Sequence, residues 1–460
     1  MQHFKLLAAA LGAAVLVAAC GGGGNGDQSP AIKYSAVVSF GDSLSDPGAY
    51  KVGAIKAMGG GMFTVNGIAG AVGADPVPSY NWEQLVSAAA IGRNSCAARK
   101  GGFGVAVEVD TTGLCTNYAQ GGSRVTFPKG TGNKVGAGDY SKALTEPVVT
   151  QVANFLAASS GSRFTGTELV TVLAGANDLF GQATILTDTV GAALVGSLVA
   201  QLTAGAPSVN QAAAQGAIYT ATLAAAGLPG ATPASIITDA ITAAGTHAYD
   251  YTYTNTAVAN AAVVGQTAGL AAQTAATTGA QTAVVGMETA ANELAASVKN
   301  MLSKGATRVV VVNLPDVSKT PYALSTIKGS DNSTQQLVLA MTMAFNSALQ
   351  AGLAGTPGVL FVDAFSENQR QIANQAHYGL TNVTGTACNL NYGVNPLATL
   401  GNADGSSLAC KQDSAPGLPA NLIAGDSSRY LFADGVHPTP YGHKLLAQYV
   451  TKALVIAGWL

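Results

Sequence analysis

Residues Tyr34–Gly48 read YSAVVSFGDSLSDPG and set the fold class of the chain. Tyr34–Phe40 is β-branched and aromatic, and it is short enough for a buried strand. Gly41-Asp42 is a turn signal, so we expect Ser43 where the strand ends and a helix begins. Open α/β sheets bind ligands at this edge, and a helix N-terminus favours a developing oxyanion. Ser43 is therefore a candidate nucleophile; the alternative is a plain Ser/Asp N-cap.

Further apolar runs of strand length alternate with helical segments along the chain. The runs are Glu168–Ala174, Ala306–Asn313 and Gly358–Asp363. The helical segments are Val148–Ala158, Gln335–Leu353 and Tyr441–Ala457. Strands that alternate with helices predict a parallel sheet in an α/β layer fold.

The composition bounds the class of protein. Of 460 residues, 10% are charged and the net charge is −2, which argues against a nucleic-acid partner because such a partner needs a basic face. A hydrophobic content of 48% is ample for a large core.

An Ala/Thr/Gly-rich region extends from Thr187 to Lys304. We expect small packed helices there, with breaks at Pro207, Gly227–Pro233 and Gly245. The region contains a predicted insertion, Gly205–Gly286, which carries the aromatic residues Tyr249, Tyr251 and Tyr253. This insertion is expected to be either a lid or membrane-facing flap, or an inert elaboration.

The N-terminus has the features of a targeting segment. Lys5 precedes the apolar run Leu6–Ala19, which is too short to span a bilayer as an anchor. The run ends in VAAC, residues 17–20, which resembles a bacterial lipobox, so residues 1–19 are predicted as a signal peptide and Cys20 as the lipidated residue. Residues 20–33 would form a flexible tether. The expected location is exported and membrane-anchored, facing the periplasm or the cell surface; the alternative is an ordinary cleavage site.

The other four cysteines form an even set in a chain expected in an oxidising compartment. Loop closure costs less between near neighbours, which favours the pairs Cys96–Cys115 and Cys388–Cys410. A zinc site is the rival interpretation, but no C-x-x-C spacing or histidine pair supports it.

His437 is the histidine best placed for catalysis, because Asp434 lies three residues before it. That spacing lets the carboxylate hold one imidazole nitrogen and leaves the other free to take a proton from Ser43. His443 fits helix packing, and His247 and His377 lack a neighbouring carboxylate.

Four blocks in order resemble the GDSL (SGNH) lipase/esterase family. They are Phe40–Asp46, Gly121-Gly122, Gly175–Asp178 and Asp434–Pro438. The resemblance implies a flavodoxin-like three-layer α/β/α sandwich with a central parallel sheet over residues 34–460. A second Gly-Asp-Ser, Gly425–Ser427, follows no convincing strand and is predicted to be a turn.

The family's roles carry over by position. Ser43 matches the nucleophile, His437 the general base and Asp434 its orienting partner. The oxyanion hole would be the Ser43 N–H, the Asn177 amide and a glycine N–H, where alignment favours Gly122 over Gly121. Taken alone, Asn177 and the glycine pair would be ordinary turn or cap residues.

The implied activity is hydrolysis of a lipid or short-chain acyl ester, with no metal or organic cofactor. The membrane would be a partner through the N-terminal lipid. Two alternatives stay open: a carbohydrate O-acetyl esterase on the same fold, and a non-catalytic surface-binding lipoprotein.

Overall fold

The computed structural model describes most of the chain after the N-terminal segment. The described ranges are 32–67, 79–131, 142–204, 211–226, 232–247, 260–327, 329–390, 406–411 and 421–460. The predicted lipidation residue Cys20 and the aromatic residues Tyr249, Tyr251 and Tyr253 lie outside them.

A parallel sheet forms the centre of the fold. Its strand order is β1 (Val37–Gly41), β4 (Leu169–Leu173), β5 (Val309–Val312) and β6 (Val359–Val362). Each strand falls on one of the predicted apolar runs. Beyond β1, Asn117 pairs in parallel with Ser39, and Tyr118 N–H donates to the Ser39 carbonyl at 2.8 Å. This short bridge occupies the position of a fifth strand.

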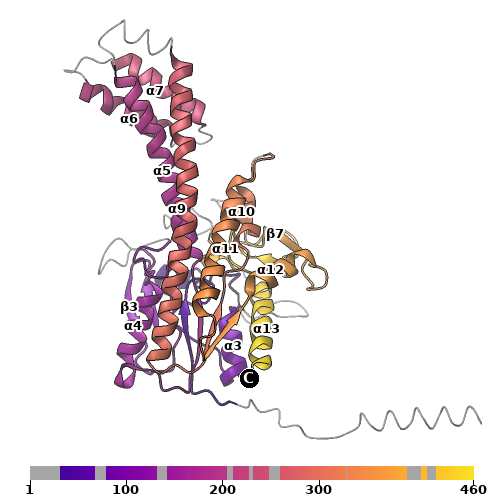
Figure 1. Cartoon of the computed structure of the whole chain (residues 1–460). Coiled ribbons are helices and arrows are strands. Elements are labelled where there is room, and N and C mark those ends of the chain that lie inside the picture. Colours follow the sequence, from indigo (N-terminus) through magenta and orange to yellow (C-terminus); the bar gives the residue numbers. More distant parts are fainter. Residues whose placement is uncertain are drawn as a thin grey trace, which may run out of the picture.

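Helices cover both faces of the sheet (Figure 1). One face packs against α4 (Val148–Ala158), the second half of α9 (Ala261–Ser303) and α11 (Ser333–Leu353). The other packs against α3 (Trp82–Ile91) and α13 (Pro440–Ile456).

Alternation along the strands explains the two layers. Val38 and Phe40 face the first layer, whereas Val37 faces the second. All three side chains are buried, as expected for a parallel sheet covered on both sides. The fold is the predicted three-layer α/β/α sandwich.

Smaller elements surround the sandwich. The hairpin of β2 (Arg99–Gly102) and β3 (Val105–Val109) is antiparallel, and β7 (Asn382–Thr386) pairs with β8 (Tyr430–Phe432) in parallel. The remaining α-helices of the sandwich are α2 (Gly53–Ala57), α10 (Pro321–Ser325) and α12 (Ala364–Ala373). Short 3-10 helices lie at Ser160–Ser162, Val317–Lys319 and Ser407–Ala409.

A helical arm, residues 189–282, projects from the sandwich between β4 and β5 (Figure 1). It consists of most of α5 (Ala176–Thr203), α6 (Gln211–Ala226), α7 (Pro233–His247) and the first half of α9. Leu198, Leu202, Ile218, Ala240 and Val264 belong to a core of its own near the tip. The arm rises from the carboxyl edge of the sheet, and the first described residues lie at the opposite edge.

The predicted helical character of this region is therefore found, but one predicted break is wrong. Gly245 lies inside α7, which continues to His247. A glycine costs a helix only about 1 kcal/mol, so it need not end one. Gly286, the predicted end of the insertion, likewise lies inside α9.

Candidate active site

Ser43 follows β1 at the carboxyl edge of the sheet, as predicted. Asp42 N–H donates to the carbonyl of Leu173 at 3.3 Å, which fixes the loop to the end of β4. Ser43 is 8% exposed to solvent, and it lines a cavity.

The expected helix after Ser43 is wrong. Residues 43–45 form a turn, with the Ser45 N–H bonded to the Asp42 carbonyl at 3.1 Å, and the next helix, α2, begins only at Gly53. Asp46 explains the difference: its carboxylate accepts the N–H groups of Gly48 and Ala49 at 2.8 and 2.6 Å, and Pro47 disfavours helical backbone at the residue before it. The Ser43 N–H therefore has no helix dipole behind it.

His437 lies between Asp434 and Ser43. Its Nε2 is 2.8 Å from Ser43 Oγ, and its Nδ1 is 2.7 Å from Asp434 Oδ2. Asp434 and His437 both lie in the loop between β8 and α13, whereas Ser43 lies in the loop after β1. The structure thus brings together the three residues that the sequence singled out.

Backbone donors hold the Asp434 carboxylate in place. Oδ1 accepts the N–H groups of Val436 and His437 at 2.9 and 2.8 Å, and Oδ2 accepts the Ser407 N–H at 2.6 Å. Burial alone would raise the pKa of Asp434, but the charge of His437 and these hydrogen bonds outweigh it and hold the pKa well below its ordinary value. Asp434 is thus an anion suited to orienting the imidazole.

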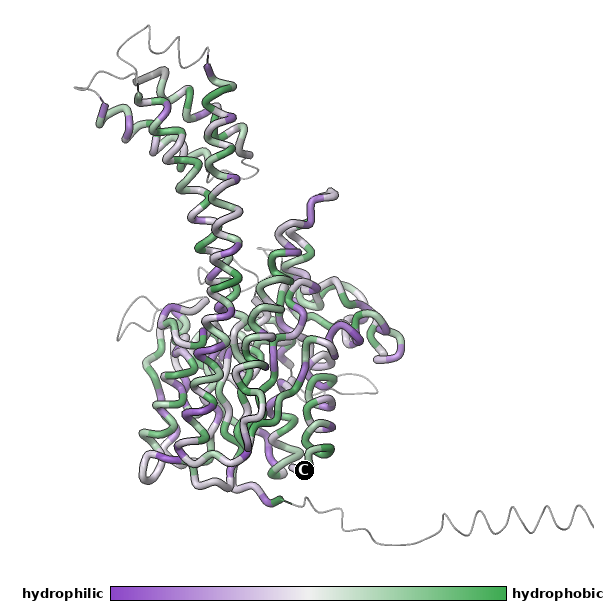
Figure 2. Tube along the Cα trace, in the orientation of Figure 1, coloured by the Kyte–Doolittle hydropathy of each residue, from purple (hydrophilic) through white to green (hydrophobic). Residues whose placement is uncertain are grey.

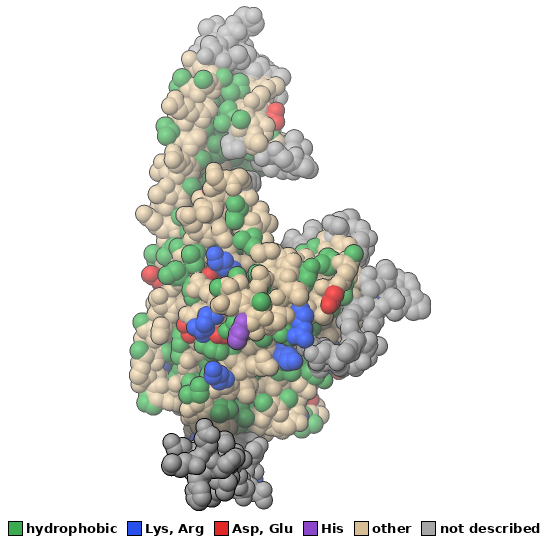
Figure 3. Space-filling model, turned by 90° about the vertical axis from the view of Figure 1, so that its right-hand side faces the viewer, with side chains coloured by type: hydrophobic (Ala, Val, Ile, Leu, Met, Phe, Trp, Pro, Cys, Tyr) green, Lys and Arg blue, Asp and Glu red, His purple; other side chains and the backbone are tan. Residues whose placement is uncertain are grey.

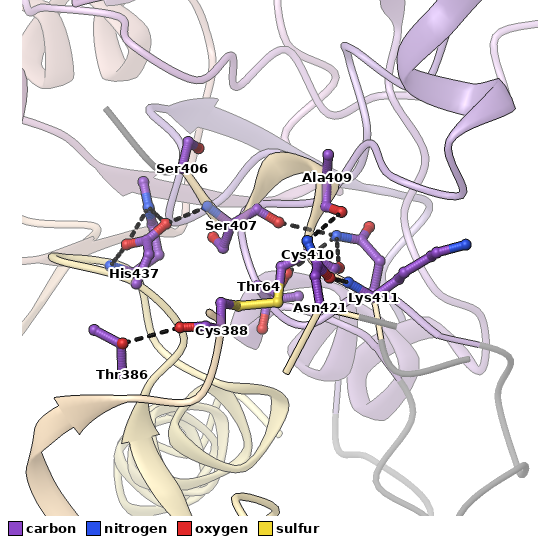
Figure 4. Close-up of a disulfide and its surroundings, with 12 residues drawn as sticks. Thr64, Thr386, Cys388, Ser406, Ser407, Ala409, Cys410, Lys411, Asn421 and His437 are labelled. Carbon is purple, nitrogen blue, oxygen red and sulfur yellow. Dashed lines mark hydrogen bonds and ion pairs between the residues drawn. A yellow bond between two sulfur atoms is a disulfide. The ribbon is translucent and has the colours of Figure 1, made fainter. Parts of the chain in front are cut away.

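The disulfide Cys388–Cys410 restrains the segment that contains Ser407 (Figure 4). It joins two cysteines that are 22 residues apart in the sequence. Asn66 adds a second anchor, because its Nδ2 donates to the carbonyls of Ser407 and Cys410 at 3.2 and 2.9 Å. The other disulfide is Cys96–Cys115. Both pairings are those predicted from loop closure. In the described ranges, no cluster of three His, Cys, Asp or Glu side chains has metal-binding geometry.

The two glycines of the predicted oxyanion block are used differently. Gly121 N–H donates to Asp46 Oδ2 at 2.8 Å. Gly122 N–H has no hydrogen-bond partner among the described residues, and Gly122 lines the cavity. Its φ of +81° and the Thr131 carbonyl, which a Cβ would meet at 2.1 Å, explain why this position needs glycine. The free donor is therefore on Gly122.

Asn177 is the second residue of α5 and is 5% exposed. Its Nδ2 donates to the Ser123 carbonyl at 3.0 Å and, because a primary amide has two hydrogens, a second donor is available at the cavity. The adjacent Asp178 forms a buried ion pair with Arg124 at 3.0 Å and accepts the Val125 N–H at 3.0 Å. These contacts fix the start of α5 against the segment after Gly122.

His443 and His377 are not part of this hydrogen-bonded arrangement. His443 is buried in α13, where its Nδ1 faces the Trp82 N–H at 3.4 Å and burial lowers its pKa to about 3. His377 packs edge-on against the Tyr378 ring after α12. The second Gly-Asp-Ser, Gly425–Ser427, precedes β8 outside any helix or strand; Gly425 is in a bend, and the turn lies just after the predicted position, at residues 428–429.

Several neighbours of the site were not assigned from the sequence. The Asp46 carboxylate positions backbone N–H groups, the Ser407 N–H holds the Asp434 carboxylate, and the Phe63 ring lies 4.9 Å from the His437 ring. The Asp-Pro-Gly turn could have indicated Asp46, since aspartate in such turns bonds to the following backbone N–H groups. Nothing local to Ser407 or Phe63 indicates contact with residues so distant in the sequence.

A cavity of about 720 Å³ adjoins Ser43, Asn177 and His437. Much of its wall is apolar and aromatic: Phe63, Phe103, Phe180, Leu314, Val317, Tyr322, Leu408, Leu431 and Phe432. The first turns of α5, through Asp188, also line it, whereas no described residue of the predicted insertion Gly205–Gly286 does. The structure therefore gives no support to the lid hypothesis for that segment.

Comparison with known proteins identifies one family. Residues 273–450 match the model of the GDSL-like lipase/acylhydrolase family, which is less than half of the 460 residues. The matched range includes β5, β6, Asp434 and His437; Ser43, Gly122 and Asn177 precede it and join it in space. The match supports a general role in ester hydrolysis. No curated protein matches the chain.

Proposed function

Since the chain contains a GDSL-like lipase/acylhydrolase domain, we propose that it is a serine esterase or lipase that acts through an acyl-enzyme on Ser43. One observation carries this proposal. Asp434, His437 and Ser43 form a continuous hydrogen-bonded line, with contacts of 2.7 and 2.8 Å. A nucleophile, a base and a group that orients the base are the parts that acyl transfer needs.

The acylation step follows from this line. His437 Nε2 takes the Ser43 proton while Oγ attacks the ester carbonyl, and Asp434 stabilises the imidazolium that forms. The oxyanion is met by the N–H groups of Ser43 and Gly122 and by the Asn177 amide. His437 then gives its proton to the leaving alcohol, and the acyl group stays on Ser43.

Deacylation repeats the sequence with water. His437 takes a proton from a water molecule, which attacks the acyl carbonyl, and the same donors hold the second oxyanion. Collapse of this intermediate releases the carboxylic acid and returns the proton to Ser43. This chemistry consumes only ester and water, so it needs no cofactor.

The apolar cavity beside Ser43 favours fatty-acyl esters over acetylated carbohydrates. A pocket lined by aromatic and aliphatic side chains gains free energy from burying methylene groups, about 0.8 kcal/mol each. Sugar hydroxyls in the same pocket would lose hydrogen bonds with water. A non-catalytic binding role is disfavoured, because binding alone would not need the line from Asp434 to Ser43.

For the location, we propose an exported bacterial lipoprotein anchored through Cys20 and facing the periplasm or the cell surface. The lipobox-like VAAC, residues 17–20, and the glycine-rich tether after it support the anchor. Two disulfides favour an oxidising compartment. Cys20→Ser should release the protein from membranes and remove the lipid mass; a retained lipid mass would overturn the proposal.

The test of the activity is Ser43→Ala, assayed on p-nitrophenyl esters of increasing chain length together with phospholipid and acetylated glycan. Turnover should be lost, and the thermal midpoint should change little because only one hydroxyl is removed. Wild-type kcat/KM should rise from acetate to longer acyl chains. Turnover retained in the purified variant would refute the role of Ser43, and a preference for acetylated glycan would favour the deacetylase alternative.

A further inference from the structure

The helical arm presents an unusually uncharged surface for a segment that projects into solvent. Between residues 189 and 282 the sequence has no lysine or arginine, and its acidic residues are Asp239 and Asp250. Lysine and arginine gather instead over the sandwich, as the face in Figure 3 shows. The net charge of the arm therefore gives it little solubility of its own.

Apolar side chains are exposed along the arm. Tyr219, Leu223, Val263 and Leu270 are each about half exposed or more, at 52%, 48%, 60% and 57%. Hydrophobic residues recur from the base of the arm to its tip (Figure 2). These side chains stand on α6 and α9, and exposed apolar residues on an arm that projects into solvent are candidates for contact with a protein or a membrane.

The threonines of the arm do not make its surface strongly polar. Many of its threonine hydroxyls donate to the carbonyl four residues earlier in the same helix, at 2.6–3.0 Å: Thr189, Thr203, Thr220, Thr222, Thr238, Thr242, Thr267, Thr274, Thr277 and Thr282. A hydroxyl that is bonded within its own helix can enter an apolar phase without losing a partner.

The helix α5 links this surface to the candidate active site. In the described part of the chain it is the one helix long and apolar enough to cross a membrane, and only 11% of its most apolar window is buried. It begins at Ala176, next to Asn177, and Phe180, Ala183, Thr184 and Thr187 line the cavity before it continues into the arm. The helix α5 therefore runs from the wall of the cavity beside Asn177 into the arm, where it packs with α6 and α9.

We propose that the helical arm inserts its exposed apolar face into the surface of a lipid bilayer. The absence of cations identifies the ligand as lipid acyl chains and not anionic headgroups, because polybasic segments are what recognise anionic lipid. The arm leaves the sandwich at the edge opposite to residue 32, the first that the structure describes, and it shares no residue with the lipid anchor proposed at Cys20.

Docking would place the mouth of the cavity near the acyl layer that supplies the proposed substrate. To that extent the inference rests on the proposed esterase activity. The binding itself does not, since it uses none of Ser43, Asp434 or His437. Ser43→Ala should therefore dock as the wild type does, so that loss of turnover and loss of docking can be told apart.

The experiment places a tryptophan on the arm of the full chain. Leu223→Trp is mixed with phosphatidylcholine vesicles brominated in the acyl chains, and Ile456→Trp, at an exposed apolar position at the end of α13, is the matched control. The emission of the two native tryptophans, Trp82 and Trp459, is measured on the wild type and subtracted from both. The Leu223→Trp emission should shift to the blue and be quenched, equally at low and high salt. The control should show neither change, even if an N-terminal lipid tethers the protein to the vesicle.

A charge variant provides the second measurement. Tyr219 and Leu223 are one turn apart on α6, so Tyr219→Lys/Leu223→Lys puts two cations on one exposed face. We expect vesicle affinity to fall at least about tenfold. Val455→Lys/Ile456→Lys should leave it unchanged. Turnover of a water-soluble acetate ester should be equal in both variants.

Three results would overturn the proposal. The first is an unquenched tryptophan at position 223, and the second is equal quenching at position 456. The third is a blue shift of the Leu223→Trp emission that grows with protein concentration without lipid, which would mean that a second copy of the chain covers this face.

Discussion

The carboxylate of Asp46 accepts the Gly121 N–H at 2.8 Å and so joins the loop of Ser43 to the glycine turn. The same carboxylate accepts the N–H groups of Gly48 and Ala49. One buried side chain therefore fixes the distance between the nucleophile and the free N–H of Gly122. Burial raises the pKa of Asp46 to about 6, so at pH 8 it is the anion that accepts these bonds.

Asp46→Asn should lower kcat by about tenfold or more with little change in KM, because an amide nitrogen cannot accept one of these N–H groups and the glycine turn moves. Steady-state kinetics on a p-nitrophenyl ester at pH 8 measure this. Glu168→Gln is the matched control: that carboxylate also accepts two backbone N–H groups, at the opposite edge of the sheet, and its loss should affect stability only. Equal kinetics in the two variants would refute the positioning role of Asp46.

Asn177→Ala should lower kcat by roughly 10²–10³ and leave KM nearly unchanged, since the amide is proposed to act on the oxyanion. The lost bond to Ser123 should cost about 1 kcal/mol of unfolding free energy. Asn346→Ala, which removes two buried bonds to the backbone of Leu314, is the stability control. An effect of Asn177→Ala on KM alone would make it a substrate-positioning residue.

The two disulfides should differ in their effect on catalysis. Cys388→Ser/Cys410→Ser should destabilise the protein by about 3 kcal/mol and also lower kcat, because the closed loop carries the Ser407 N–H that holds Asp434. Cys96→Ser/Cys115→Ser removes a disulfide that closes a loop of similar length without contact to Asp434, so only stability should fall. Thermal midpoints and kcat of the two variants decide the point; a drop in kcat of equal size in both would contradict it.

The burial of Glu83 predicts that the free energy of unfolding depends on pH. It is buried in α3, which raises its pKa to about 7, although hydrogen bonds from Ser95 and Asn117 oppose the rise. Between its unfolded value of about 4.3 and pH 7, the folded protein holds a proton that the unfolded chain releases. The contribution of protonated Glu83 to the free energy of unfolding is therefore fully present below about pH 4 and is lost as the pH rises through 7.

Glu83→Gln should remove this part of the pH dependence. The variant should gain a few kcal/mol of unfolding free energy relative to wild type between pH 5 and pH 8, at about 1.4 kcal/mol per pKa unit. Urea unfolding at several pH values measures the gain. Glu108→Gln, at an exposed position on β3, serves as the control and should leave the wild-type slope unchanged. Parallel curves for wild type and Glu83→Gln would show that Glu83 is not protonated in the fold.

The sheet was predictable because buried parallel strands are short, β-branched runs. The run Val309–Val312 is an example: all four side chains are fully buried and the segment allows no other interpretation. The pair of Asp434 and His437 was predictable as well, since three residues of separation bring both side chains to one side of a tight loop.

Other parts depend on contacts that the sequence does not encode locally. The helix expected after Ser43 fails because the Asp46 carboxylate accepts the N–H groups of Gly48 and Ala49, which a helix would bond to its own carbonyls, and because Pro47 disfavours helical backbone at Asp46. The choice between Gly121 and Gly122 depends on that same side chain. The direction of the arm depends on how α5 packs against α9, and alternating alanine and threonine leave several helix faces equivalent.

The hydrogen bond between Ser43 and His437 closes a sequence separation of 394 residues. During synthesis the nucleophile emerges near the beginning and its base near the end, after the arm and all four central strands. The helices α6 and α7 need only nearby partners and can form early. A growing or truncated chain that ends before His437 therefore has no base to activate Ser43, and it cannot hydrolyse esters by this mechanism.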